Sequence, residues 1–171
     1  MPMAEPDPYL LAITEPDRDD VRRLTSSSDA YLASLYPAES NHLTDIAALV
    51  SKDVTFLAAL CAGEAVGCGA LVRTRPGECE LKRMFVAAAH RRRGLARRIL
   101  RALEVIASEE KRVVRLETGV KQPEAMALSK SAGFVDIASF GSYAPDPLSV
   151  FMEKRFGVKT GELAKSTIRR G

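Results

Sequence analysis

The sequence predicts an α/β protein of the α+β type, with a mixed, mostly antiparallel sheet of six to seven strands flanked by about four helices. Strand-like and helical segments alternate, three successive strand-like runs are joined by short turns, and an arginine-rich helix follows the third run. With 171 residues, 46% hydrophobic and 27% charged, the chain suits one soluble domain.

The first third of the chain predicts one strand and two helices. YLLAIT (9–14) has strand composition, and Pro16 opens a helical stretch to Leu35 that the serines at 26–28 are expected to break. Residues 41–50 carry apolar side chains at helical spacing, with Ser40 or Asn41 as the candidate cap.

The middle of the chain predicts an antiparallel meander. Its runs at 54–60, 65–75 and 78–86 are joined by CAGE and PGE, which favour hairpins. A helix begins after Gly94 with an apolar stripe, and a strand at 113–119 follows it, which makes the helix a crossover.

The last third predicts a short helix and two closing strands. The helix at 123–132 has proline at its start and Gly133 just past its end. The strands are expected at 134–138 and 149–154. The single domain would then cover 9–156, after a disordered start at 1–8 and before a basic, flexible tail at 157–171.

Several classes of protein are disfavoured by what the sequence lacks. No apolar run approaches the roughly 20 residues of a membrane span, and the N-terminus lacks the basic start and apolar stretch of a signal peptide. We therefore expect a cytoplasmic protein with no membrane partner. The cysteines have no Cys-x-x-Cys spacing, so we expect no metal, and neither a Walker loop nor a Gly-x-Gly-x-x-Gly fingerprint occurs.

The junction between the run at 78–86 and the helix that follows it predicts a phosphate-binding site. The first N–H groups of a helix have no partner in the helix and carry partial positive charge. Gly94 and Ala96 leave that backbone open, and Arg91, Arg92 and Arg93 add positive charge. The alternative is a basic, solvated helix entrance with no ligand.

The same residues resemble a known family. ELKRMFVAAAHRRRGLARRILRALE is similar to the central signature of the GNAT N-acetyltransferases, whose Gln/Arg-x-x-Gly-x-Gly/Ala element matches Arg91, Gly94 and Ala96. SLYPAESNHL, VVRLETG, QPEAMALSKSAGF and FGSYAPDPLSVFMEK resemble further segments of a bacterial, YsnE-like subgroup. The resemblance covers most of residues 9–156.

This resemblance implies that acetyl-CoA is the acetyl donor. Its pyrophosphate would lie on the N–H groups of 91–96 and its pantetheine beside 84–86. The side-chain amide of Gln122 is a further candidate contact, and Ser129 stands where many family members have tyrosine. The implied cofactor-binding residues are Met84, Phe85, Val86, Arg91, Arg92, Arg93, Gly94, Leu95, Ala96, Gln122 and Ser129.

The implied reaction is direct attack of an amine on the thioester in a ternary complex, without an acetyl-enzyme. Glu80 is the candidate base, and its alternative role is a salt bridge with Lys82. Because Ser129 replaces the family's tyrosine acid, water or Tyr143 would protonate the leaving thiolate.

The implied acceptor is a primary amine of a small molecule, with a protein or peptide amine left open. Tyr36, Glu39, His42 and Glu117 are the candidate substrate-binding residues, and the carboxylates favour a cationic amine. Glu117 is also a second candidate base, and His42 has a capping or surface role as its alternative.

Two other functions compete with catalysis. A catalytically weak acyl-CoA-binding sensor of the same fold is favoured by the serine at 129. A nucleic-acid-binding module would use the arginines, but the chain has no tryptophan and no evident stacking array, so we expect no nucleic-acid partner. A homodimer stays open.

Overall fold

The computed structural model describes residues 3–110 and 112–157 and contains one seven-stranded sheet with four α-helices. The predicted fold class is confirmed, and the elements follow the predicted order. The predicted tail lies outside the described residues except for Gly157, as do residues 1 and 2 of the predicted disordered start. The elements are β1 (Tyr9–Ile13), α1 (Asp19–Leu35), α2 (Ile46–Leu49), β2 (Val54–Cys61), β3 (Glu64–Arg75), β4 (Glu78–Val86), α3 (Leu95–Glu109), β5 (Val113–Gly119), α4 (Pro123–Ser131), β6 (Val135–Ile137) and β7 (Ser149–Arg155), with single 3-10 turns at Ala38–Ser40 and Ala88–His90.

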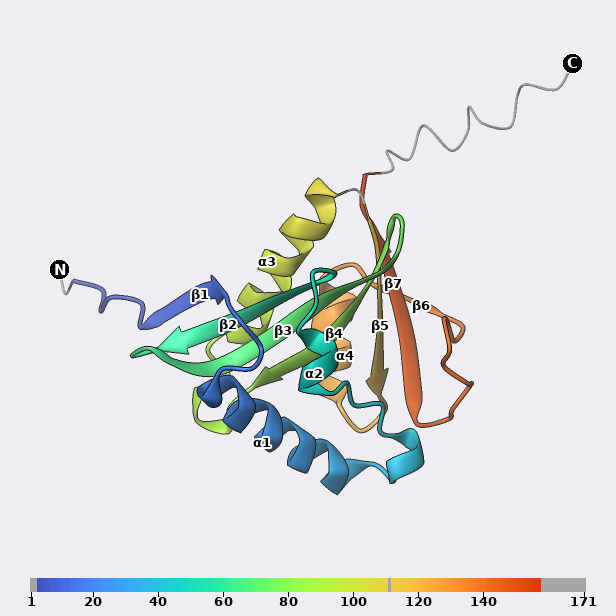
Figure 1. Ribbon diagram of the computed structural model, residues 1–171, viewed down its shortest axis with the longest axis horizontal. Coiled ribbons are helices and arrows are strands. Elements are labelled where there is room, and N and C mark those ends of the chain that lie inside the picture. Colours follow the sequence, from blue (N-terminus) through green and yellow to red (C-terminus); the bar gives the residue numbers. More distant parts are fainter. Residues whose placement is uncertain (1–2, 111, 158–171) are drawn as a thin grey trace, which may run out of the picture.

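The sheet has the strand order β1-β2-β3-β4-β5-β7-β6, and only the β4–β5 pair is parallel (Figure 1). The meander over β2, β3 and β4 and the crossover through α3 are therefore as expected from the turns and the helix. Among the described residues, no helix combines the length and the apolar character that a membrane crossing requires.

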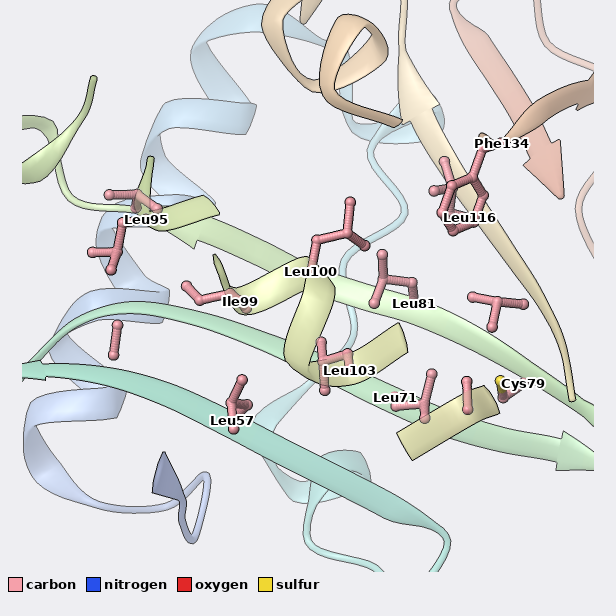
Figure 2. Close-up of a cluster of buried hydrophobic side chains, with 14 of the residues drawn as sticks. Leu57, Leu71, Cys79, Leu81, Leu95, Ile99, Leu100, Leu103, Leu116 and Phe134 are labelled. Atoms are coloured by element: carbon pink, nitrogen blue, oxygen red, sulfur yellow. The ribbon is translucent and has the colours of Figure 1, made fainter. Parts of the chain in front are cut away.

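Helices cover both faces of the sheet. On one face, Leu95, Ile99 and Leu103 of α3 pack onto Leu57 and Leu71 of the sheet, within the larger core cluster (Figure 2). On the other face lie α1 and α2 (Figure 1). They bury Val21, Leu24 and Leu49 against Phe56 and Cys68. The sheet is thus the middle layer of a three-layer domain.

The expected break in α1 at the serines is wrong, because the helix is continuous. Hydroxyls that could compete with the helix instead bond to carbonyls one turn back. Thr25 Oγ1 donates to the carbonyl of Val21 at 3.0 Å, and Ser27 Oγ donates to that of Arg23 at 3.1 Å. Ser28 is buried against the rest of the protein.

The expected helix over 41–50 is wrong for its first half. Residues 41–45 have no regular structure, and α2 is limited to Ile46–Leu49. The carbonyl of Thr44 accepts a hydrogen bond from Arg83 Nε at 2.9 Å. A side chain of the sheet therefore competes for a carbonyl that a longer helix would use.

The C-terminal half of β4 is irregular in two ways: it contains a β-bulge, and it separates from β5. The register with β3 places Cys68 opposite Phe85 and Ala70 opposite Lys82, so two residues of β4 face one of β3 in a β-bulge. The ladder with β5 runs from Glu78 to Leu81 only. Beyond it the two strands diverge, as their arrows show in Figure 1.

Candidate active site

Two hollows lie where β4 and β5 separate. The first, the α3 groove, has a volume of about 450 Å³ and is formed by the end of β4, the loop before α3 and the starts of α3 and α4. It is lined by residues 84–86, 90–92, 94–97 and 122–125, with Tyr31 and Leu128.

The second hollow, the β4–β5 cavity, has a volume of about 160 Å³ and lies between the two strands, with lining residues from α1 on one face of the sheet and from α3 and α4 on the other. It is lined by residues 40–44, 80–84 and 116–119, with Ser28, Leu32, Tyr36, Leu100, Gln122, Ala125, Leu128, Ser129 and Tyr143. Met84, Gln122, Ala125 and Leu128 line both hollows, so the two meet at a common wall.

The α3 groove presents backbone N–H groups. Gly94 precedes α3 in the left-handed conformation, with φ of 73°, and none of the described side chains caps the helix. A Cβ at Gly94 would meet nothing within 4 Å, so the glycine serves the backbone conformation and leaves the surface open. The first turn of α3 can therefore bind an anion.

The three consecutive arginines have different surroundings. Arg91 Nε donates to the carbonyl of Val86 at 2.9 Å, and its guanidinium lies 5.3 Å from the Tyr31 ring and 5.5 Å from the Phe85 ring. Arg91 thus braces one wall of the groove by hydrogen bonding and cation–π contact. Arg92 lines the groove, whereas Arg93 is exposed outside it.

A carboxylate, a phenol and an amine interact at the floor of the β4–β5 cavity. Glu80 is 7% exposed, and its carboxylate accepts a hydrogen bond from Tyr143 Oη. Lys82 Nζ donates to Tyr143 Oη at 2.8 Å and lies 3.3 Å from Glu80 Oε1. Burial, reinforced by Glu80, raises the pKa of Tyr143, so this phenol keeps its proton at neutral pH.

Glu117 is the second carboxylate of the cavity and stands at the end of β5. Its carboxylate accepts a hydrogen bond from Ser149 Oγ at 2.9 Å. Over the described ranges of the chain, no lysine, arginine or histidine forms an ion pair with it. Burial raises the pKa of Glu117, and Ser149, His42 and Lys82 only partly oppose the rise. Glu117 is therefore suited to bind a cation or to accept a proton.

Tyr36 closes the cavity at the end of α1. Its hydroxyl accepts from the N–H of Lys121 at 3.0 Å and donates to Gln122 Oε1 at 3.3 Å. A Cβ at Gly119 would lie 1.9 Å from Tyr36 Oη, so only glycine at 119 permits this packing. The imidazole of His42 stands edge-on to the Tyr143 ring, with centroids 5.2 Å apart.

The structure brings most of the predicted site residues into the two hollows. The α3 groove receives Met84, Phe85, Val86, Arg91, Arg92, Gly94, Leu95, Ala96 and Gln122. The β4–β5 cavity receives Glu80, Tyr143, Tyr36, His42, Glu117 and Ser129.

Three predicted residues are placed differently from the expectation. Ser129 lines the cavity and not the groove, and its hydroxyl donates to the carbonyl of Ala125 at 3.0 Å within α4. Glu39 is exposed on the 3-10 turn Ala38–Ser40, and Arg93 is exposed on the loop before α3. Neither of these two side chains lines a hollow.

Two charged residues of the cavity, Lys82 and Arg83, were not among the predicted site residues. Lys82 shares the two-residue period of a strand with Glu80, so this periodicity could have identified it. Arg83 would point to the opposite face in a regular strand, and its position follows from the β-bulge. In the part of the chain that the structure describes, no cluster of His, Cys, Asp and Glu could hold a metal ion.

An anion-binding helix start beside a cavity with a buried carboxylate is the arrangement expected of an enzyme that transfers a group from a phosphorylated carrier. Residues 19–134 match the acetyltransferase (GNAT) family, and the chain belongs to that family. It is an acyltransferase that takes its acyl group from an acyl-CoA.

Relatives and solved structures agree with this assignment. The chain is 45% identical over 150 residues to an IAA acetyltransferase of Azospirillum brasilense, covering 84% of this chain and 95% of that protein. It is 34% identical over 142 residues to the N-acetyltransferase YsnE of Bacillus subtilis, covering 78% and 93%. A Klebsiella pneumoniae structure described as an acyl-CoA N-acyltransferase superposes with a TM-score of 0.74 at 34% identity, covering 87% and 98%. The predicted family and subgroup are confirmed.

Proposed function

We propose that the protein transfers an acetyl group from acetyl-CoA to the primary amine of a small molecule, by direct attack in a ternary complex. The observation that carries this proposal is the wall shared by the two hollows at Met84, Gln122, Ala125 and Leu128. A donor in the α3 groove and an acceptor in the β4–β5 cavity would meet at that wall. No covalent enzyme intermediate is then needed.

The donor's phosphates would bind the N–H groups at the start of α3, between Arg92 and Ala96. Arg92 and Arg97 line the groove beside them and supply positive charge. Because the ladder with β5 stops at Leu81, no described strand pairs with the edge of β4 over 82–86 on that side. The amide groups of the pantetheine can pair with this edge as an added strand would.

Glu80 would take the proton of the attacking amine, directly or through a water molecule. The amine nitrogen bonds to the thioester carbon, the tetrahedral intermediate collapses, and the carbon–sulfur bond breaks. Tyr143 gives its proton to the leaving thiolate and recovers one from Glu80 through their hydrogen bond. A CoA thiol with a pKa near that of cysteine, about 8.5, makes only a modest demand on this acid.

Glu117, Tyr36 and His42 would contact the acceptor. The cavity volume of about 160 Å³ is below the roughly 300 Å³ of common ligand pockets, which supports a small acceptor group. Glu117 has no ion-pair partner among the described residues, which supports a cationic acceptor. A relative bears the name IAA acetyltransferase, so IAA is the competing candidate acceptor.

The donor site is tested by thermal unfolding with and without acetyl-CoA, in the parent chain and two glycine variants. Gly94→Glu places a carboxylate at the start of α3, and Gly77→Glu is the matched control. Both glycines have positive φ and no atom within 4 Å of an added Cβ, so the backbone strain is comparable. Acetyl-CoA at about 100 times its Kd should stabilise the parent and the control by about 2.7 kcal/mol, or roughly 5 to 10 °C. Gly94→Glu should lose this rise, and an equal rise in all three proteins would contradict the assigned donor site.

The acceptor is tested with a panel of cationic amines, neutral amines, acidic compounds and IAA. Release of free CoA is the readout, and acetylated product is identified by mass. We expect turnover with small cationic amines. Turnover restricted to acidic or neutral compounds, including IAA, would contradict the proposed acceptor class without affecting the donor site.

A further inference from the structure

Arg83 occupies an unusual backbone position in the middle of the domain. It lies in the β-bulge of β4 with φ of 57°, a left-handed conformation that costs free energy for any residue except glycine. Such a conformation persists only where surrounding contacts hold it, and bulges beside active sites often redirect side chains.

The bulge turns the Arg83 side chain onto the α1 face of the sheet, where it meets Asp29 of α1 and Thr44. Leu81 belongs to the core cluster on the α3 side (Figure 2). Met84 packs against that cluster, whereas Phe85 packs with Cys68 on the α1 side. Lys82 points to the α1 side, where it reaches Tyr143. Arg83 follows on the same side, so two consecutive residues of β4 face the cavity.

The side chain of Arg83 is 6% exposed, and each of its three guanidinium nitrogens has an ion-pair or hydrogen-bond partner. Its guanidinium forms an ion pair with Asp29 of α1 and donates two hydrogen bonds to the carbonyl of Thr44, one of them from Nε at 2.9 Å. The backbone carbonyl of Arg83 accepts a hydrogen bond from the thiol of Cys68 at 3.1 Å. A buried charge with such partners is costly to remove and fixes the geometry of what it joins.

Both partners belong to segments that form the acceptor side of the cavity. Thr44 lines the cavity together with residues 40–43, and Asp29 follows Ser28, which lines it from α1. Arg83 itself is next to Met84, where the two hollows meet. One side chain thus joins the outer wall of the cavity to the strand segment that faces both proposed ligands.

We infer that Arg83 is a positioning residue for the transfer reaction, which holds the 40–44 wall of the β4–β5 cavity against the bulge of β4. This inference rests on the proposed function for its effect on turnover. That Arg83 connects Thr44 of the cavity wall to β4 rests on the structure alone.

The test compares Arg83→Met and Asp29→Asn with Arg73→Met as the matched control. Arg73 likewise pairs with a carboxylate, that of Glu110 at 2.9 and 2.6 Å, but it lies on β3 and outside both hollows. Arg83→Met should lower kcat/KM for the acceptor by roughly 10- to 100-fold, because small misplacements of reacting groups are costly. Acetyl-CoA affinity should change by less than about twofold, and Asp29→Asn, which keeps the acceptor atom, should have a smaller effect in the same direction.

Amide hydrogen exchange separates this inference from the proposed function, because it requires no turnover. Exchange at residues 41–50 should accelerate in Arg83→Met and remain unchanged in Arg73→Met. Unchanged exchange at 41–50, or unchanged acceptor kinetics in an active protein, would overturn the inference. Inactivity of the parent with every amine would contradict the proposed function, and the exchange result would then decide whether Arg83 ties the wall.

Discussion

The α3 groove and the β4–β5 cavity share a wall, but they are built from different parts of the chain. Much of the groove comes from one continuous stretch, from the end of β4 through the loop to the first turn of α3, and it presents backbone groups. The cavity gathers side chains from α1, the 40–44 segment, β4, β5 and the loop that carries Tyr143. The groove is thus a local feature, whereas the cavity depends on the whole tertiary structure.

This difference separates donor binding, which depends on backbone groups, from the transfer chemistry, which depends on specific side chains. Backbone N–H groups at a helix start bind phosphates with little regard for the side chains around them. The cavity chemistry depends on the contacts of Tyr143 with Glu80 and Lys82, which lie 63 and 61 residues earlier in the sequence. We therefore expect substitutions in the cavity to change turnover while leaving donor binding intact.

The largest effect is expected for Glu80→Gln. Loss of the proposed base should lower kcat by about 10² to 10⁴-fold, whereas the thermal stabilisation by acetyl-CoA should stay as in the parent. Glu78→Gln is the matched control, since Glu78 lies two residues earlier on the same strand, pairs with Arg115 at 3.0 Å and does not line the cavity. Steady-state kinetics with the best acceptor provide the measurement. Equal losses in the two variants would show that the effect is structural.

A smaller effect is expected for Glu117→Gln, which should raise stability and lower activity. Burial raises the pKa of Glu117, so at a pH above that pKa the ionised, buried carboxylate lowers the free energy of unfolding. At neutral pH the variant should unfold about 1 to 4 °C higher, a gain of about 0.5 to 1 kcal/mol, while KM for a cationic acceptor rises.

The pH dependence of that gain provides the check. In the parent, Glu117 takes up its proton as pH falls through the raised folded-state pKa, and the opposition to folding disappears below the unfolded-state value near 4.5. Unfolding curves of parent and variant should therefore converge in acid. A variant less stable than the parent at neutral pH would mean that the ionised carboxylate has a partner that stabilises it.

The smallest effect is expected for Ser129→Ala. The Ser129 hydroxyl is already bonded to the carbonyl of Ala125 inside α4, so it has little to offer a ligand. Turnover should change by less than about twofold, and the unfolding free energy by about 0.5 kcal/mol or less. A tenfold loss of kcat, measured with the same acceptor, would instead identify Ser129 as part of the catalytic machinery.

The predictability of each region from sequence follows from the range of its interactions. Gly94 and the strand before it could be identified because a motif, a strand and a helix start lie within a few residues of one another. Glu80 and Lys82 follow from the two-residue period of a strand. Arg83 could not be found this way, since a bulge that reverses the alternation has no local signature when its left-handed residue is not glycine.

The errors in the helices have the same origin. The serines of α1 have weak helix propensity, yet the helix continues because the hydroxyls bond within it and Ser28 is buried. The 41–45 segment has a helical pattern, yet a carbonyl in it is taken by Arg83 from the sheet. In both places tertiary contacts outweigh local preference, which single-sequence patterns do not contain.

The wall shared by the two hollows makes the protein a candidate for cooperative ligand binding. Any displacement of Met84 or Gln122 by one ligand alters the site of the other, because these side chains face both. A thermodynamic cycle then requires that acetyl-CoA change the acceptor's Kd by the same factor by which the acceptor changes that of acetyl-CoA. The order in which the two ligands bind is determined by rates, whereas this coupling factor is an equilibrium property of the residues that both ligands contact.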